Sequence, residues 1–155
     1  MKINKNILLL SMGGLSVFIS CAYLYDVKIQ PITNQEFAPI QENIPIQFFP
    51  SDQFNENYHQ KIAVLKIVDP REYQNDIHEV FRTNALERFK KTARSIGAQN
   101  ISFINLKVEK NPHSPGDYEI FDRFGKKVVV HQTQSFETYK YSIECIAIRN
   151  TKFRP

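Results

Sequence analysis

One stretch of the chain, from Asp69 to Gly97, repeats apolar residues at helical spacing, and strand patterns lie on both sides of it. The apolar positions three or four residues apart form a single stripe and are Ile77, Phe81, Ala85, Phe89, Ala93 and Ile96. A lone amphipathic helix among strands has to bury its stripe against a sheet. The pattern therefore predicts an α+β fold, with four or five strands in a mixed or antiparallel sheet and one long helix packed on one face.

The two ends of this helix are predicted from capping residues. Asp69–Glu72 combines an N-cap residue, a proline suited to the first helical position and a glutamate placed to complete a capping box. Gly97 suits the left-handed conformation that ends many helices. Asn84 with Glu87 offers a second cap, so the sequence leaves open whether the helix is one piece or two.

Apolar and β-branched runs predict the strands. The three longest are Lys61–Val68, Ile101–Glu109 and Thr138–Arg149. A hairpin is expected from Tyr118–Phe121 and Lys127–Gln132, with Gly125 taking a positive φ in the turn. Two prolines and a glycine predict a loop between Asn111 and Asp117.

The first 60 residues read as two segments that precede the α+β domain of residues 61–155. Residues 1–20 have the layout of an export signal, in which Lys2 and Lys5 precede an apolar run. Residues 21–60, which begin at Cys21, contain four prolines and no glycine, and this composition predicts a tether. Short edge strands are expected within this tether at Tyr25–Gln30 and Pro45–Phe49.

The end of the signal segment leaves three possibilities open. Val17–Cys21 resembles a bacterial lipobox, although Phe18 and Ser20 stand where Leu and a smaller residue are usual. The resemblance implies that Cys21 becomes the acylated first residue, with palmitate among its chains, and Ala22 after it favours the outer membrane over the inner. Cleavage after Ala22 is the second possibility, and an uncleaved membrane anchor is the third.

The net charge does not favour a nucleic-acid-binding surface. The chain has 20 basic and 16 acidic residues, and loss of residues 1–20 removes only Lys2 and Lys5, which leaves 18 against 16 and a net charge of +2. Such a balance lacks the excess that phosphate backbones select. The basic residues late in the helix read as a solvated face, with a lipid or nucleic-acid patch as the alternative; they are Arg88, Lys90, Lys91 and Arg94.

The segment from Ala85 to Glu109 resembles a helix–Gly–Ala–Asn–strand element of small bacterial envelope lipoproteins. Gly97-Ala98-Gln99-Asn100 ends the helix here, and Cys145–Arg149 resembles the closing strand of those domains. Gln99 stands where that family often has Asn, and the disulfide-forming cysteines of one branch are missing. The resemblance implies an α+β domain over about residues 61–149 and no defined active site.

No residue pattern specifies a catalytic centre, a metal site or a cofactor. The four histidines lack metal-ligand spacing, and phosphate-loop or nucleophile-elbow motifs do not occur. Cys145 reads as a buried strand residue, with a reactive thiol as the alternative, and a Cys145/His131 nucleophile pair is the weakest candidate. The aromatic cluster Tyr118, Phe121 and Phe124 is the better candidate, either as an interaction patch or as a cover for the sheet.

The sequence thus favours a non-enzymatic, lipid-anchored envelope protein that acts as an interaction or sensory module. Its expected partners are the membrane, through the anchor, and another envelope protein or a host factor. A small-ligand-binding lipoprotein is the alternative, and a deep apolar pocket between helix and sheet would favour it. A small exported enzyme is the third class.

Overall fold

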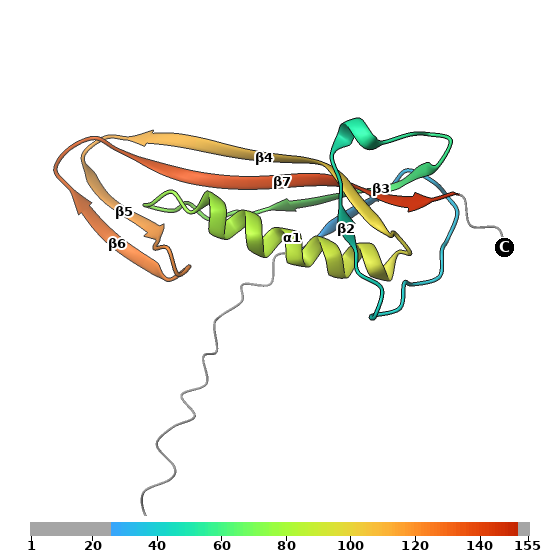
Figure 1. Ribbon diagram of the computed structural model, residues 1–155. Helices are drawn as coiled ribbons and strands as arrows, with labels where there is room; N and C mark the ends of the chain where they lie inside the picture. Colours follow the sequence, from blue (N-terminus) through green and yellow to red (C-terminus); the bar gives the residue numbers. More distant parts are fainter. Residues whose placement is uncertain (1–25, 152–155) are drawn as a thin grey trace, which may run out of the picture.

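The computed structural model describes residues 26–151 and is α+β, with a five-stranded mixed sheet and one helix (Figure 1). Strand order across the sheet is β1-β3-β7-β4-β2, and a separate two-stranded sheet holds β5 and β6. The strands are β1 (Lys28–Pro31), β2 (Gln47–Phe48), β3 (His59–Val68), β4 (Asn100–His113), β5 (Gly116–Phe121), β6 (Lys127–Gln132) and β7 (Phe136–Asn150). The helix is α1 (His78–Ser95), and a short 3₁₀ turn covers Ser51–Gln53.

The central strand β7 is flanked by β3 and β4, and both pairs are antiparallel. Buried residues alternate along β7, which places Tyr141, Ile143 and Cys145 on one side of the sheet. The parallel member is β2, which pairs with the start of β4. The predicted alternation of β7 is therefore confirmed, and the sheet is mixed rather than wholly antiparallel.

The two short edge strands expected before residue 60 are present at opposite edges of the main sheet. β1 pairs with β3, from Lys28 opposite Lys66 to Pro31 opposite Ala63. Ile46 is buried beside β2, and Arg94 of the helix donates a 3.0 Å hydrogen bond to the Ile44 carbonyl. These contacts tie residues 26–60 to the sheet at several points.

The helix begins at His78, so the predicted start at Asp69–Glu72 is wrong. Asp69 does not cap a helix, because its carboxylate binds the Arg71 guanidinium. At the actual start, Asp76 Oδ1 accepts the His78 N–H at 3.0 Å, while the Tyr141 hydroxyl accepts the Ile77 N–H at 2.7 Å and donates to Asp76 Oδ1 at 2.9 Å. From there α1 runs to Ser95 without a break, so Asn84 does not divide it.

The C-terminal end of α1 follows the prediction. Gly97 has φ 79°, and the next residue, Ala98, donates a 2.9 Å hydrogen bond to the Ala93 carbonyl. A Cβ at position 97 would lie 2.6 Å from Cβ of Phe37 and 2.7 Å from the Ala38 oxygen. Glycine is therefore required both by the backbone conformation and by the close approach of residues 37–38.

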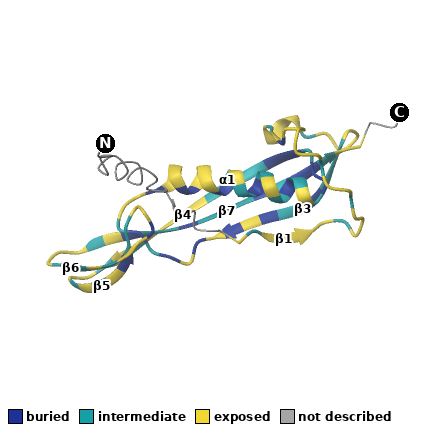
Figure 2. Cartoon of the chain, turned by 90° about the horizontal axis from the view of Figure 1, so that it is seen from below, coloured by how far each residue is buried: buried dark blue, intermediate teal, exposed yellow. Residues whose placement is uncertain are grey.

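One hydrophobic cluster joins the helix to the sheet (Figure 2). The helix contributes its predicted stripe, in which Phe81, Ala85, Phe89 and Ala93 have no exposed surface. The sheet contributes residues of β3, β4 and β7, among them Leu65, Ile67, Ile101 and Ile143. Full burial of such side chains stabilises a fold by roughly 1.5–3 kcal/mol each.

β4 departs from the sequence prediction in two ways. Its register shifts between Ser102 and Asn105, where Phe103 has φ 53°, so a bulge interrupts the expected alternation. The strand also continues to His113, and the loop predicted from Asn111 to Asp117 shrinks to Ser114-Pro115. Pro112 is tolerated inside β4 because β4 has a partner on only one side there, within the described chain.

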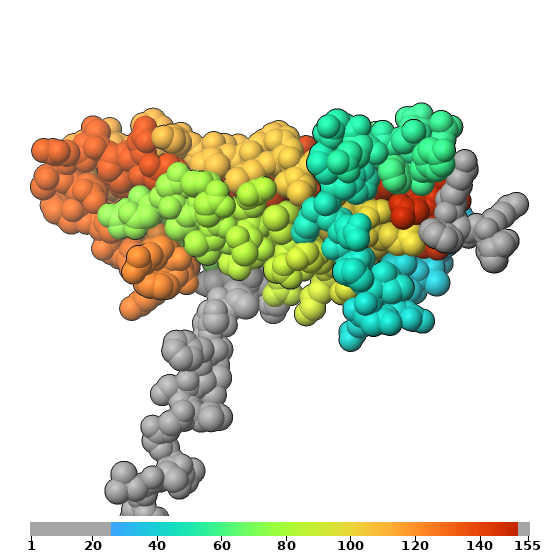
Figure 3. All heavy atoms as spheres, in the orientation of Figure 1, coloured from blue at the N-terminus to red at the C-terminus, as the bar shows by residue number. Residues whose placement is uncertain are grey.

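β4 and β7 extend past the N-terminal end of α1 and carry the β5–β6 hairpin, which folds back beside them as a lobe at one end of the molecule (Figures 1 and 3). The predicted hairpin is present, with Ile120 opposite Val128, and Gly125 has the expected positive φ of 75°. Ile120 is the only buried side chain of these two strands. We call the far halves of β4 and β7 together with the hairpin the distal arm.

Candidate interaction surfaces

The β5–β6 hairpin of the distal arm is held beside β7 by the segment between β3 and α1. Tyr73 and Tyr139 exchange two backbone hydrogen bonds of 2.9 Å each. On the other side of this segment, the Glu72 carbonyl accepts a 2.8 Å hydrogen bond from the Phe121 N–H. Residues 72–74 thus bridge β7 to β5 and set the position of the hairpin.

A buried ion pair holds this bridging segment in place. Asp69 is fully buried in its side chain, and its two oxygens accept hydrogen bonds of 2.7 and 2.6 Å from Arg71. The Tyr73 hydroxyl donates a third bond of 2.7 Å to Asp69. Because bidentate arginine–carboxylate pairs fix direction as well as distance, this cluster determines the path of residues 69–73.

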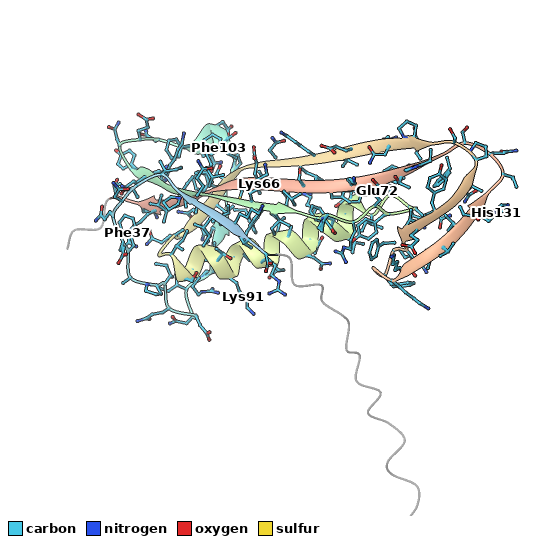
Figure 4. All side chains as sticks on the ribbon, turned by 180° about the vertical axis from the view of Figure 1, so that it is seen from behind. Phe37, Lys66, Glu72, Lys91, Phe103 and His131 are labelled. Atoms are coloured by element: carbon cyan, nitrogen blue, oxygen red, sulfur yellow. The ribbon has the colours of Figure 1, made fainter. Side chains whose placement is uncertain are left out.

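A second polar cluster surrounds Glu72 at the root of the arm (labelled in Figure 4). Lys140 Nζ lies 2.7 Å from Glu72 Oε1, and the Thr138 hydroxyl donates to Oε2 at 3.1 Å. His113 Nε2 lies 2.8 Å from that hydroxyl oxygen, and since the hydroxyl proton is directed to Glu72, His113 is the donor. The hydrogen bond from Lys140 is the main cause of a lowered pKa for Glu72, and the same bond raises the pKa of Lys140.

Tyr118, the first residue of the predicted aromatic patch, lies at the end of the arm. Its ring contacts His113 with centroids 4.8 Å apart and Phe136 with centroids 5.2 Å apart. Its hydroxyl donates a 3.0 Å hydrogen bond to the Ser114 carbonyl. Tyr118 is half-buried by these contacts, which close the turn between β4 and β5.

Phe121, the second residue of that patch, packs against the hydrophobic cluster of the body. Its ring centroid lies 6.2 Å from that of Tyr73 and 5.8 Å from the Arg71 guanidinium carbon. Phe121 and Tyr118 therefore make contacts with different neighbours, in accordance with their positions on opposite faces of β5.

Phe124, the third residue, is 71% exposed in the turn between β5 and β6. The turn is held by Asp122, whose Oδ1 accepts the N–H groups of Phe124 and Lys126, both at 2.9 Å. Arg123 places its guanidinium carbon 4.7 Å from the Phe124 ring centroid. The structure thus presents Phe124 on a well-bonded turn, flanked by the cations Arg123 and Lys126.

Cys145 and His131 are not brought together. Cys145 is buried in β7 opposite Leu65 of β3, and burial raises the pKa of its thiol to about 12. His131 is exposed on β6, where it pairs with Asp117 of β5 (Figure 4). The thiol and the imidazole therefore belong to different sheets.

An apolar groove of about 600 Å³ lies between the edge strand β1 and the C-terminal end of α1. Its apolar lining comes from Ile29, Pro31, Phe37, Pro39, Ile62 and Ile96. Polar side chains of residues 33–36 border it, and Phe37 is labelled in Figure 4. The sequence analysis missed this groove, because it forms only when residues 33–39 pass over the end of the helix.

The bulge in β4 creates an aromatic cluster that the sequence analysis also missed. Lys61 Nζ lies 4.7 Å from the ring centroid of Phe54 and 4.8 Å from that of Phe103, which is labelled in Figure 4. The two rings meet edge to face, with centroids 5.6 Å apart. Since the chain's own Lys61 already occupies the space over both rings, this cluster stabilises the fold around β4.

Within residues 26–151, no helix is long and apolar enough to cross a membrane, and no group of three or more His, Cys, Asp or Glu side chains could hold a metal ion. The Cys21 lipidation site predicted from the lipobox lies outside the described residues. No family model, no curated protein and no solved structure matches this chain. The case for function therefore depends on the surfaces described above.

Proposed function

We propose that this protein is a non-enzymatic cell-envelope lipoprotein that acts as an interaction or sensory module. Its export and anchoring are supported by the two lysines, the apolar run and the lipobox-like end at Cys21. Ala22 supports placement in the outer membrane rather than the inner. We further propose that α1 packs along one face of the sheet and stiffens it. The four residues of α1 with no exposed surface support this packing.

The exposure of Phe124 is the observation that carries the interaction function. Large aromatic side chains with little cover are common at binding surfaces, where they supply much contact area. Here the side chain stands in the turn of a hairpin whose other two aromatics are partly buried, Tyr118 against β4 and β7 and Phe121 against the Asp69–Tyr73 segment. The interaction patch predicted from three aromatics is thus proposed to act through Phe124, against another component of the envelope.

The anchoring is tested by intact mass and detergent partitioning of the membrane fraction, for the wild type and Cys21→Ala. We expect a mature mass that begins at Cys21 and includes acyl chains, lost together with membrane partitioning in the variant. A full-length mass, or a lipid-free mass that begins at Tyr23, would contradict the lipoprotein proposal.

The interaction surface is tested with a photoreactive amino acid at position 124 in cells. Position 129 provides a matched control, because Val129 is 70% exposed on the same hairpin but lies in the strand rather than the turn. Crosslinks from position 124 that position 129 does not give would support the patch. Equal crosslinking from both positions, or none from either, would contradict it.

The apolar groove beside β1 favours a second candidate function, the binding of a small apolar ligand. Pockets of this size that combine an apolar lining with a polar border are typical ligand sites. Ile29→Glu would place a charge on the lining and should abolish binding of an apolar fluorescent probe. Ile32→Glu is the control, since Ile32 has similar exposure, 49% against 45%, and does not line the groove. Unchanged probe binding in Ile29→Glu would exclude the groove as the site.

A further inference from the structure

The turn of the hairpin, the start of the described chain and the basic side of α1 lie on the same side of the molecule. Figure 1 and the opposite view in Figure 4 show the β5–β6 turn and the N-terminal end of β1 on the lower side. Lys91 is labelled on that side as well (Figure 4). These three features come from distant parts of the sequence, so their common direction was not predictable from it.

The described chain begins at Asp26, five residues after Cys21. Five fully extended residues span at most roughly 18 Å. If Cys21 carries lipid, the side of the domain from which the chain emerges must therefore stay close to the bilayer surface. This step rests on the proposed anchoring.

The charges on this side suit an anionic surface. On α1, Glu79 pairs with Arg82 and Glu87 pairs with Lys90. Arg88 and Lys91, three residues apart and so neighbours on the helix, have no carboxylate within ion-pairing distance among residues 26–151. Lysine and arginine near an anionic membrane surface are attracted to it.

The hairpin turn repeats this arrangement around an aromatic side chain. Lys127 pairs with Glu119, whereas Arg123 and Lys126 have no carboxylate partner in the described chain. Phe124 stands between these two cations. An exposed aromatic ring beside cations is the combination that settles at the interface between headgroups and acyl chains.

We propose that the β5–β6 turn is a second membrane contact, in which Phe124 enters the interface of an anionic phospholipid bilayer while Arg123 and Lys126 bind headgroup phosphates. The lipid at Cys21 and the turn then hold the domain at two points. The side of α1 that carries Lys91 then faces the bilayer, and the opposite side of the sheet faces away from it. The partner of the proposed interaction surface is thus the membrane itself.

The chain contains no tryptophan, so one substitution provides a specific fluorescent probe. Phe124→Trp in the full chain, reconstituted into phosphatidylglycerol vesicles, should shift its emission to the blue and lose most of its intensity when the acyl chains are brominated. Val129→Trp, equally exposed on the same hairpin, should keep the emission of a water-exposed indole. Arg123→Gln with Lys126→Gln, added to Phe124→Trp, should weaken the quenching on anionic vesicles.

Flotation and intact mass separate the two proposals. If the Phe124→Trp protein carries acyl mass and floats with the vesicles but its indole emission stays unshifted and unquenched, the second contact is wrong and the anchor stands. If the protein lacks acyl mass, the anchor is wrong. The quenching of the indole in Phe124→Trp is then measured after vesicles are added to the lipid-free protein, and an absence of quenching overturns the membrane contact as well. Crosslinking of position 124 to a protein in place of lipid would also overturn it.

Discussion

At the scale of single residues, Asp69 is the side chain whose environment differs most from what the sequence predicts. It is fully buried and binds Arg71 and Tyr73, instead of capping a helix at the surface. Removal of one member of a buried ion pair leaves the other charge uncompensated, which typically costs about 3–5 kcal/mol. We expect Asp69→Asn to lower the free energy of unfolding by that amount in urea denaturation.

Glu79→Gln is the matched control for this prediction. Glu79 is 69% exposed and lies 4.0 Å from Arg82. Exposed pairs of this kind contribute about 0–1 kcal/mol. If Asp69→Asn were no more destabilising than Glu79→Gln, the Asp69–Arg71 pair would not hold the bridging segment as we describe.

Glu72 leads to a prediction about pH. Its pKa in the folded protein is lowered from the ordinary value of 4.5, chiefly by the hydrogen bond from Lys140. A lowered pKa means that the carboxylate stabilises the fold above pH 4.5, and that this contribution is lost as the pH falls through the folded pKa. The pKa of Lys140 is raised from 10.5, so its contribution is present below that pH and is lost above it.

We therefore expect Glu72→Gln to be less stable than the wild type at neutral pH, with a difference that shrinks as the solution is acidified below pH 4.5. The measurement is the free energy of unfolding of both proteins from neutral to acidic pH. A difference that stays constant across this range would show that Glu72 stabilises the fold through packing and not through its charge.

At the scale of elements, the sequence predicted what depends on local periodicity and missed what depends on distant partners. The helical stripe, the hairpin with Gly125 and the end of the helix at Gly97 are confirmed because each depends on residues close together in the chain. The predicted start of the helix is wrong because Asp69 binds Arg71 and Tyr73, and the hydrogen bonds at the actual start come from Asp76 and from Tyr141, more than sixty residues away. Similarly, Pro112 reads as a loop residue until the edge position of β4 is known.

Gly97 carries the prediction that belongs to this scale. An alanine there would meet Phe37 and the Ala38 oxygen at less than 3 Å, in a backbone conformation that disfavours side chains by roughly 1–2 kcal/mol. We expect Gly97→Ala to destabilise the protein by at least that amount in thermal or urea unfolding. Ser95→Ala, two residues earlier and exposed, should change stability by less. Equal effects would show that the contact with residues 37–38 is not fixed.

At the scale of the whole molecule, the candidate surfaces could be predicted only in part. The aromatic residues of the hairpin are visible in the sequence, but burial separates Phe124 from Tyr118 and Phe121 in a way that only the fold reveals. The groove is built from β1, the helix end and residues 33–39, which share no sequence motif. Surfaces formed by several distant segments have no local pattern to detect.

The division into a body and a distal arm predicts unequal local stability. β3 buries four residues, among them Leu65 and Ile67 with no exposed surface, whereas the two hairpin strands together bury only Ile120. Regions with few buried apolar contacts open at lower free energy than the core. Amide hydrogens of β5 and β6 should therefore exchange faster with solvent than those of β3, measured by mass spectrometry or NMR.

Glu72→Gln sharpens this test, because the Glu72 cluster lies at the root of the arm. Loss of the charge should speed exchange in the hairpin and leave β3 nearly unchanged, whereas Glu79→Gln should affect neither. If exchange in β3 rose as much as in the hairpin, body and arm would open together as one cooperative unit. A hairpin that opens on its own would still keep Phe124 on its turn, since Asp122 bonds the turn locally. The arm would then be able to change its angle while the β5–β6 turn keeps the membrane contact that we propose for it.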